Sequence, residues 1–392
     1  MEIALILFAL LGHVFLWIGL VNRLHAIGIR RWIIKVITVA FFACMATIPA
    51  AAAWWIAVGG ARLPLGAPPH PGTLLLFGYL YACLFVAATT LLRLIYRCVL
   101  CHTPRVVSFH RRRPLHVAPV EAAGAADKRP HHFLTRLPGN EILGLELSEW
   151  ILDVPRLSPA LDGLSIVHLS DLHFTGRVGK SYFREVMNLC NGLDPDLVAI
   201  TGDLVDDSEC VAWISDTLGR LGARHGVYFV LGNHDIRVDL GRLRGALRDS
   251  GLIDLGGRWV QIDVRGEAVI LAGNELPWIG PAADMTTCPP RVSGCGPLRI
   301  VLSHSPDQLP WSRANDADLM LAGHTHGGQI RIPPLGAIFS PTFEGVKYIS
   351  GVFHEPPTIL HVSRGISGDV PVRLNCPPEV ALLKLRAAGT TA

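Results

Sequence analysis

Three long apolar runs without an Asp, Glu, Lys or Arg residue dominate the first hundred positions, at residues 3–21, 36–58 and 73–92. Each run is close to the roughly 20 residues that a helix needs to cross a bilayer. Three such runs in succession are unusual in the core of a soluble protein. The pattern therefore predicts a membrane domain over residues 1–105, with transmembrane helices at about 3–21, 33–58 and 73–97.

The hydrophobic pattern changes after the third run. Residues 106–144 are rich in Pro, Ala, His and Arg and lack apolar periodicity, which predicts a linker. From residue 145 to residue 392 the chain has short apolar runs that end in polar residues, and amphipathic stretches separate the first of them. This alternation predicts a single α/β domain in which strands and helices follow one another.

Five of these apolar runs are followed, directly or after one glycine, by Asp, Asn or His. The runs cover residues 164–170, 196–201, 226–231, 298–303 and 317–322. Amphipathic stretches at 179–191, 208–221 and 239–250 are candidate helices between and after the first three. Open α/β sheets bind ligands at the carboxyl ends of their strands, so we expect these polar residues to form one site.

Composition excludes a disordered chain, because half of the 392 residues are apolar, only 17% are charged and the mean hydropathy is +0.38. The formal net charge of +3 hides a division. Residues 1–105 hold eight basic residues and one acidic residue, whereas the part after residue 130 holds 22 basic and 29 acidic residues. An acidic second half with few lysines argues against nucleic-acid binding.

Basic residues in the short loops predict the orientation in the membrane. The segment after the first apolar run holds Arg23, Arg30, Arg31 and Lys35, the segment after the second holds only Arg62, and several arginines follow the third. The N-terminus is therefore expected outside and everything after residue 93 on the cytoplasmic face of an inner (plasma) membrane. Membrane lipids are expected partners, and the sequence leaves the oligomeric state open.

The ligand types at the five strand ends favour a metal site. Carboxylates, an amide oxygen and imidazoles without a thiolate suit divalent Mn, Fe, Zn, Ni or Mg, among which we favour Mn. Seven side chains are too many for one tetrahedral ion, so the set fits two adjacent ions that share a carboxylate. A lone Asp or His at a strand end is more often structural, and only the joint pattern supports this interpretation.

The ordered motifs resemble those of the calcineurin-like metallophosphoesterase superfamily. They are Asp171-x-His173, Gly202-Asp203, Gly232-Asn233-His234-Asp235, His304 and Gly323-His324-Thr325-His326. The resemblance covers about residues 163–365. The tract 323–341, with residues 363–365 and 371–383, looks like the YkuE/YaeI-type branch, which includes membrane-associated enzymes similar to UDP-diacylglucosamine hydrolases. The resemblance implies a four-layer αββα sandwich after the three membrane helices.

The resemblance also implies a role for each motif residue. Of seven metal ligands, the first ion takes Asp171, His173 and His326, the second takes Asn233, His304 and His324, and Asp203 bridges them. His234 is implied as an acid outside the ligand set, and Asp235 is a candidate to orient it. Arg364 and Arg331 lie near motif residues and are candidates to bind a second phosphate, although an ordinary surface role is the favoured interpretation of Arg331.

Two ions about 3.5–4 Å apart suit the hydrolysis of a phosphomonoester, phosphodiester or pyrophosphate bond, because they clamp the oxygens and lower the pKa of water to supply a hydroxide nucleophile. Our leading substrate hypothesis is a lipid-linked phosphoester or pyrophosphate such as UDP-diacylglucosamine of lipid A synthesis. A nucleotide or phosphoprotein in the cytoplasm is the alternative substrate. An inactive membrane scaffold or sensor is the alternative of a different class.

Overall fold

The computed structural model describes residues 2–58, 70–96, 103–115, 117, 133–291 and 296–387. It divides the chain into two compact units, residues 1–102 and residues 103–392. The division lies three residues before the end that the apolar pattern predicted for the membrane domain.

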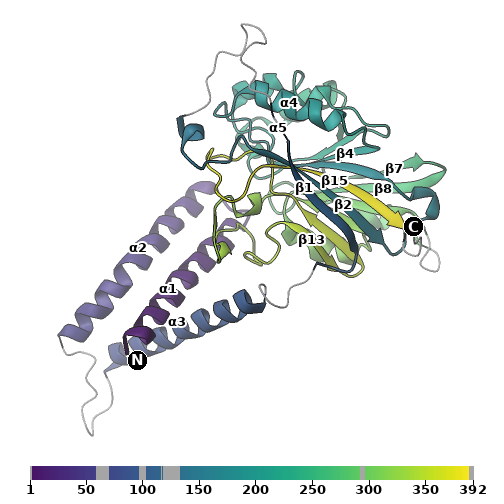
Figure 1. The fold of residues 1–392 in the computed structure, drawn as a ribbon. Helices are drawn as coiled ribbons and strands as arrows, with labels where there is room; N and C mark the ends of the chain where they lie inside the picture. The colour runs from purple at the N-terminus through teal and green to yellow at the C-terminus, as the bar shows by residue number, and fades with distance from the viewer. Residues whose placement is uncertain are drawn as a thin grey trace. The chain divides into compact units, whose positions relative to one another are not determined.

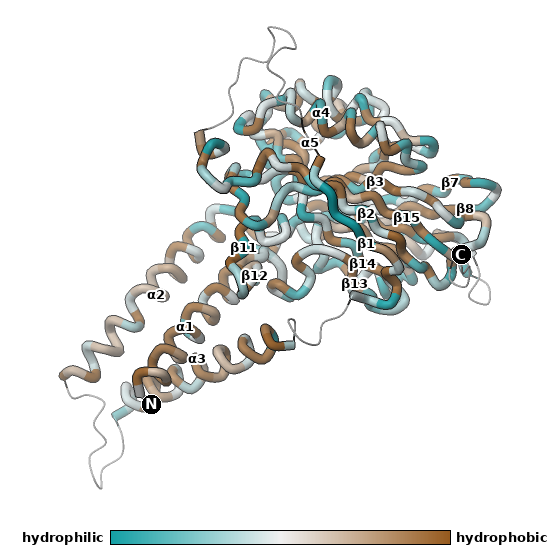
Figure 2. The backbone as a smooth tube through the Cα atoms, in the orientation of Figure 1, coloured by the Kyte–Doolittle hydropathy of each residue, from teal (hydrophilic) through white to brown (hydrophobic). Residues whose placement is uncertain are grey.

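The first unit consists of three long helices, α1 (Glu2–His25), α2 (Arg31–Ala57) and α3 (Pro71–Ile95) (Figure 1). Their most apolar 18-residue windows have mean hydropathies of 2.5, 2.1 and 2.0, and Figure 2 shows how far apolar residues extend along them. Each helix is long and apolar enough to cross a membrane, as the sequence predicted. The expected end of the third helix at residue 97 lies outside the described residues.

Helices α1 and α3 approach each other closely at Gly12. A Cβ atom added to Gly12 would lie 1.8 Å from the carbonyl oxygen of Cys83, so only glycine fits at this crossing. At the next residue, His13 Nδ1 lies 2.5 Å from the Tyr79 hydroxyl of α3, and its Nε2 lies 2.8 Å from the carbonyl oxygen of Met45 on α2. Small residues and interhelical hydrogen bonds are the usual means by which membrane helices associate.

The second unit contains a seven-stranded sheet with the order β1-β2-β15-β3-β4-β5-β6. Its strands are β1 (Val107–Leu115), β2 (Leu145–Val154), β15 (Glu379–Ala387), β3 (Ser165–Leu169), β4 (Leu197–Thr201), β5 (Val227–Val230) and β6 (Ile253–Asp254). Strands β3 to β6 pair in parallel, and helices α4 (Lys180–Asn191) and α5 (Leu240–Asp249) follow β3 and β5. The strands β3, β4 and β5 and both helices lie where the hydrophobic pattern predicted them.

A six-stranded sheet with the order β13-β14-β10-β9-β8-β7 forms the other half of this unit. Its strands are β13 (Gly351–Glu355), β14 (Thr358–Val362), β10 (Leu319–Ala322), β9 (Leu298–Ser303), β8 (Glu267–Asn274) and β7 (Trp259–Val264). The short helix α6 (Leu309–Ala314) connects β9 to β10, and β8, β9, β10 and β14 are parallel. A small hairpin of β11 (Arg331–Ile332) and β12 (Gly336–Ala337) follows β10.

Three apolar cores separate four layers. Val167 of β3 packs with Phe183 of α4 in the first core, whereas the neighbouring Ile166 packs between the sheets with Ile300 of β9. Val301 of β9 faces the third core, which includes Leu309 of α6. Strands buried on both faces are apolar at successive positions, which is why they appear as continuous apolar runs in the sequence. The order helices, sheet, sheet, helix is the αββα sandwich that was expected.

The structure differs from the expected linker at residues 106–144. Residues 107–115 form β1, which pairs antiparallel with β2 at the edge of the seven-stranded sheet, and a 3₁₀ helix η2 (Phe133–Arg136) lies farther along. Seven of the nine β1 residues are exposed, so this strand lacks the apolar alternation that identifies a half-buried strand. Residues 116 and 118–132 of the expected linker lie outside the described residues.

The candidate helix at 208–221 also differs. The segment forms two short 3₁₀ helices, η4 (Ser208–Trp213) and η5 (Leu218–Arg220). Thr217 between them has φ −120° and ψ −90°, which is outside the helical region. Its hydroxyl donates to the carbonyl oxygen of Trp213, so a side chain takes the place of a backbone donor and the α-helix does not form.

Substitution of Gly12→Ala should destabilise the membrane unit, because the new methyl group overlaps the Cys83 carbonyl. We expect a loss of about 1–3 kcal/mol, the usual range for overpacking, measured by thermal unfolding of the full chain in detergent. Gly78→Ala on α3 is the matched control, since a Cβ there meets nothing within 4 Å. Equal melting temperatures for the two variants would contradict the close crossing of α1 and α3.

Candidate metal centre

The sequence-predicted site residues lie at the carboxyl ends of five parallel strands. Asp171 and His173 follow β3, Asp203 follows β4, residues 233–235 follow β5, His304 follows β9, and His324 and His326 follow β10. Because the two sheets face each other across a common core, their carboxyl ends deliver side chains from both sheets to one place.

The backbone is strained at this place. Asp171, His173, Asp203, His324 and His326 all have positive φ values, between 46° and 69°. Side chains other than glycine rarely adopt this region, and the strain is typical of functional sites. The left-handed residues turn the chain sharply at the strand ends, so that their side chains point back to a common centre.

Glycines in the motifs allow the loops to approach. A Cβ atom at Gly232 would lie 2.3 Å from Asp203 Oδ1, and a Cβ atom at Gly323 would lie 1.7 Å from the Ser170 hydroxyl. The Gly-Asn-His-Asp and Gly-His-Thr-His motifs therefore need glycine for space, because a side chain at either position would overlap the neighbouring loop.

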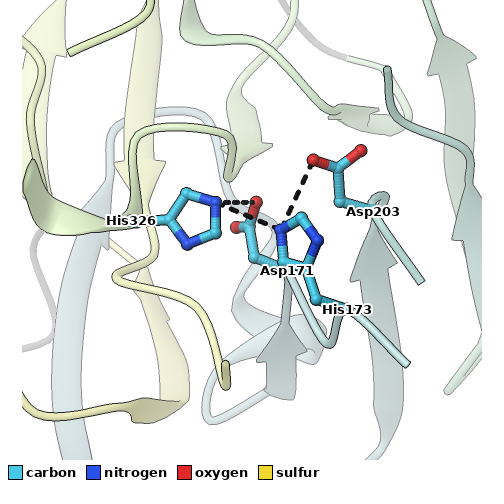
Figure 3. A group of neighbouring side chains, drawn as sticks. All are labelled: Asp171, His173, Asp203 and His326. Carbon is cyan, nitrogen blue, oxygen red and sulfur yellow. Dashed lines mark hydrogen bonds and ion pairs between the residues drawn. The ribbon is translucent and has the colours of Figure 1, made fainter. Parts of the chain in front are cut away.

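Asp171, His173, Asp203 and His326 form the first group of ligand atoms, which all lie within 4.8 Å of one another (Figure 3). Nε2 of His173 lies 3.2 Å from Nε2 of His326. Nε2 of His326 lies 3.5 Å from Asp171 Oδ1, and Nε2 of His173 lies 3.6 Å from Asp203 Oδ2.

Asp203, His304 and His324 form the second group, which meets the same limit. Nε2 of His304 lies 3.2 Å from Asp203 Oδ2, 3.1 Å from Nδ1 of His324 and 3.1 Å from the amide oxygen of Asn233. Asp203 belongs to both groups through the same oxygen. The structure thus brings together all seven residues expected as ligands, with Asp203 between two sets.

Hydrogen bonds on the far side of each ring fix the tautomers. A carbonyl oxygen can only accept, so His304 donates from Nδ1 to Thr201 O (2.7 Å) and His324 donates from Nε2 to Pro341 O (2.8 Å). In the same way His326 donates from Nδ1 to Ser367 O (3.2 Å), and His173 donates from Nδ1 to Asp206 Oδ2 (2.7 Å). Hence the nitrogens that face one another in each neutral imidazole pair carry lone pairs.

Two facing lone pairs at 3.1–3.2 Å repel unless a cation or a proton lies between them. Imidazoles that are fixed through their other nitrogen by a carbonyl or carboxylate are the usual arrangement of metal-binding histidines. The donor set of this structure, with three kinds of N and O ligand and no thiolate, therefore fits two divalent ions.

The charges of the site point the same way. Burial opposes a charged imidazole, but the carboxylates of Asp206 and Asp203 outweigh it and raise the pKa of His173 to about 9. Burial and Asp203 compete in the same manner at His304, whose pKa also rises to about 9. Burial lowers the pKa of His324 and of His326 to about 3. Buried carboxylates thus draw positive charge into the site, and two of its imidazoles stay neutral ligands.

Comparison with known proteins supports this assignment. Residues 164–328 match the family model for calcineurin-like phosphoesterases. Over 225 residues the chain is 33% identical to Phosphodiesterase YaeI of Escherichia coli (strain K12), and the match covers 56% of this chain and 81% of YaeI. The chain belongs to the calcineurin-like phosphoesterase family. It is therefore a metal-dependent phosphoric ester hydrolase, and its second unit is the phosphoesterase domain.

Two other relatives bear on the membrane anchor and on the YkuE/YaeI-type branch of the family. A Transmembrane protein with metallophosphoesterase domain of Bos taurus is 32% identical over 257 residues, which cover 60% of this chain but only 56% of the relative. The Uncharacterized metallophosphoesterase YkuE of Bacillus subtilis (strain 168) is 27% identical over 255 residues, 62% of this chain and 87% of YkuE. The likeness to YaeI and YkuE agrees with the branch that the sequence motifs resemble.

The phosphoesterase domain has a different carboxylate beside His234 from the one expected. Asp206 Oδ1 accepts from His234 Nδ1 at 2.6 Å, and its other oxygen holds His173. Asp235, the expected partner, is fully buried and accepts instead from backbone N–H groups in the loops after β4 and β5, those of Gly232, Asp203, Leu204 and Val205. It fixes the loop that carries Asp203, because its carboxylate points at the backbone.

The two candidate arginines differ in their surroundings. Arg364 is buried, its Nη2 lies 2.8 Å from Glu146 and its Nε lies 3.4 Å from Glu379, so these two carboxylates already pair its charge. This corrects the expectation that Arg364 binds substrate. Arg331 donates to the carbonyl oxygen of Gly327 and to the hydroxyl of Ser350. It forms no ion pair with a described residue, and its phosphate-binding role stays a prediction.

Three residues near the site were missed from the sequence. Asp206 lies three positions after Asp203, and this Asp-x-x-Asp spacing in a strand-end loop was the available signal. The ring centroid of Trp278 lies 4.7 Å from the ring centroid of His324 and 5.7 Å from that of His304. Fully buried Arg373 donates to the carbonyl oxygen of Ser367, which also accepts from His326. Trp278 comes from the segment between β8 and β9, where neighbouring residues give no hint of the site, whereas Arg373 lies within the tract 371–383 that carries the family resemblance.

Replacement of the shared carboxylate tests the fit to two ions. Full-length protein purified in detergent and loaded with Mn²⁺ should hold close to two ions per chain by elemental analysis, and Asp203→Ala should lose at least one of them. Loss of a residue from a metal site weakens metal binding by about 10-fold or more. The control is Asp207→Ala, a nearby acid that caps η4. Two ions in Asp203→Ala would contradict the shared position.

Proposed function

We propose that this chain is a membrane-anchored phosphoesterase that uses two divalent ions to hydrolyse a phosphomonoester, phosphodiester or pyrophosphate bond. The observation that carries the proposal is that two pairs of imidazole rings have nitrogens facing each other, one pair on each side of Asp203. When bound, two such ions supply an activated water and neutralise charge on the phosphoryl oxygens. Mn²⁺ is the ion that we favour, because N and O ligands without thiolate suit it.

The assignment of ligands follows the two groups of side chains. We assign Asp171, His173 and His326 to one ion, Asn233, His304 and His324 to the other, and Asp203 to both. The carbonyl oxygens of Thr201, Pro341 and Ser367 hold three of the imidazoles in place. Because these acceptors belong to the backbone, the protein offers the ligands in their binding orientation before any ion arrives.

His234 is the residue that we propose as the proton donor to the leaving oxygen. Its Nδ1 is held by Asp206, and its Nε2, which lies 3.4 Å from Arg237 Nη2, is the nitrogen that we propose carries the proton to the substrate. The His234 side chain is 18% exposed and that of His326 16%, whereas His173 and His304 are fully buried. Because we assign His326 to an ion, His234 is the accessible imidazole that remains to meet an incoming substrate.

His234→Ala should lower the turnover of an aryl phosphate ester by roughly 10²- to 10⁴-fold, the usual contribution of a general acid. The measurement is the steady-state rate of the full chain with Mn²⁺, and the two ions per chain should remain. His225→Ala is a matched control, because this half-buried histidine lies outside the site and Tyr228 uses only its carbonyl oxygen. Unchanged turnover in His234→Ala would rule out its role as the acid.

The membrane helices favour a lipid-linked substrate. Three apolar helices and a transmembrane relative with the same domain indicate that the protein is anchored in a membrane. A phosphoester or pyrophosphate that itself resides in the bilayer would be held next to the enzyme by the same anchor. We propose UDP-diacylglucosamine as the first representative of this class to test. The phosphodiester specificity in the name of YaeI fits the same bond types.

Detergent-purified full chain with Mn²⁺ should release UMP from UDP-diacylglucosamine faster than it releases phosphate from nucleotides or phosphopeptides. The lipid anchor concentrates the first substrate at the enzyme, and the others reach it only by diffusion. Chromatographic detection of UMP measures the reaction. Hydrolysis of an aryl ester without UMP release would leave the phosphoesterase activity intact and refute this substrate.

We also propose that the phosphoesterase domain lies on the cytoplasmic face of the inner (plasma) membrane. The support is the distribution of basic residues, which are numerous after the first and third helices and almost absent after the second. Digestion of the C-terminal half by a protease added outside intact cells would contradict this orientation.

A further inference from the structure

Exposed apolar side chains of the phosphoesterase domain gather around the metal centre. Nine large hydrophobic residues are exposed in the described part of this domain, and only Phe109 lies on a distant edge strand. The other eight are Phe133, Leu137, Ile236, Ile330, Ile332, Phe339, Phe343 and Val370. Single exposed hydrophobic residues need no explanation, but their concentration on one loop system indicates a surface that is covered in use.

The loop from Gly323 to Phe343 contributes most of this surface. It begins with the ligands His324 and His326, continues through the β11–β12 hairpin, and contains Arg331 as its only Lys, Arg, Asp or Glu. Ile332, Phe339 and Phe343 are 47–49% exposed. The carbonyl oxygen of Pro341, between the two phenylalanines, accepts from His324, which places them directly beside the second group of metal ligands.

The loop is firmly built. Phe343 N donates to Asp307, the side chain of Gln329 donates to the carbonyl oxygens of Val370 and Val372, and Arg331 N donates to Leu374 O. These bonds hold the apolar side chains outward on a fixed backbone. Their exposure is therefore a property of the fold.

Two other segments extend the same surface. The hydrogen bonds of Gln329 place Val370, which is 54% exposed, next to the loop. Asn140 bonds to the carbonyl oxygens of Leu134 and Pro371 and thereby holds η2, with exposed Phe133, beside Val370. Arg136 on η2 is exposed and forms no ion pair with any residue that the structure describes. The surface thus combines aliphatic and aromatic side chains with unpaired arginine.

We propose that this apolar loop surface docks on a lipid bilayer, with its side chains at the boundary of headgroups and acyl chains. A surface with aromatic and aliphatic residues and with arginines at its margin has the chemistry of interfacial membrane contact. Three acids also border it, since Asp307 and Glu344 lie beside Phe343 and Asp369 precedes Val370. The chain itself keeps a bilayer within reach, because only eleven residues lie between Ile95 of α3 and Val107 of β1 and the distance between these two residues is at most about 40 Å. The metal centre then opens directly at the lipid surface.

This inference concerns contact and deepens the proposed function, since a lipid-linked phosphate would reach the metal ligands from the bilayer itself. Its test needs no turnover, so the two proposals fail separately. A photoreactive residue reports the neighbour of each position. Phe339→p-benzoylphenylalanine and Phe343→p-benzoylphenylalanine in the full chain, placed in vesicles of phosphatidylethanolamine and phosphatidylglycerol, should form lipid adducts on irradiation.

Asp249→p-benzoylphenylalanine is the matched control. Asp249 is exposed and is the last residue of α5, four residues before the first residue of β6. Strand β6 pairs in parallel with β5, so its first residue lies at the amino end of the strands. The metal centre lies at the carboxyl ends, and Asp249 is therefore at the opposite edge of the sheet. We expect lipid adducts at 339 and 343 at least about fivefold above this control, because interfacial side chains lie about 5–10 Å within the boundary. Mass spectrometry of the digested protein quantifies the adducts.

Two results would overturn the proposal. Lipid adducts at 339 and 343 no more abundant than at 249 would show that this surface faces water. Crosslinks to another protein copy, or to the α1–α3 helices of the same chain, in place of lipid would show that protein covers the surface. Loss of hydrolysis in either variant does not bear on the result, because the adducts are counted directly.

Discussion

The structure depends on one carboxylate that must serve two groups of ligands at once. Oδ2 of Asp203 lies 3.6 Å from the nearest imidazole nitrogen of the first group and 3.2 Å from that of the second. The first group comes mainly from the seven-stranded sheet and the second mainly from the six-stranded sheet. The carboxyl ends of the strands in both sheets must therefore lie at the same edge of the sandwich, and the apolar core between the sheets fixes their relative position. A sandwich with a poorly packed middle core could not hold this geometry.

A second set of contacts decides which atoms face the centre. Three backbone carbonyls and one carboxylate hold the outer nitrogens of four imidazoles, so that each ring has one tautomer and one direction. Asp235 does the same for the backbone, because its carboxylate accepts four N–H groups from two loops. Burial and the nearby Asp203 charge raise the pKa of Asp235 to about 7. The ligands are thus positioned by groups that never reach the substrate.

Much of the fold, and the gathering of the seven candidate ligand residues in one place, could be predicted from the sequence, because strands buried on both faces appear as apolar runs and the candidate residues follow their ends. Contacts across the chain could not. Adjacency in sequence suggested Asp235 as the partner of His234, whereas the ring turns to Asp206, 28 residues away. Arg364 resembled a free phosphate-binding residue, but Glu146 and Glu379 pair with it from two other strands. The exposed strand β1 was missed because an edge strand needs no apolar alternation.

The left-handed backbone at Asp171, His173, Asp203, His324 and His326 links folding to ion loading. Such residues cost about 1–3 kcal/mol each. Ions that bind only the folded chain return free energy at the very positions where the fold is weakest. Metal ions that bound at these positions would therefore raise the free energy of unfolding of the chain in addition to serving the reaction.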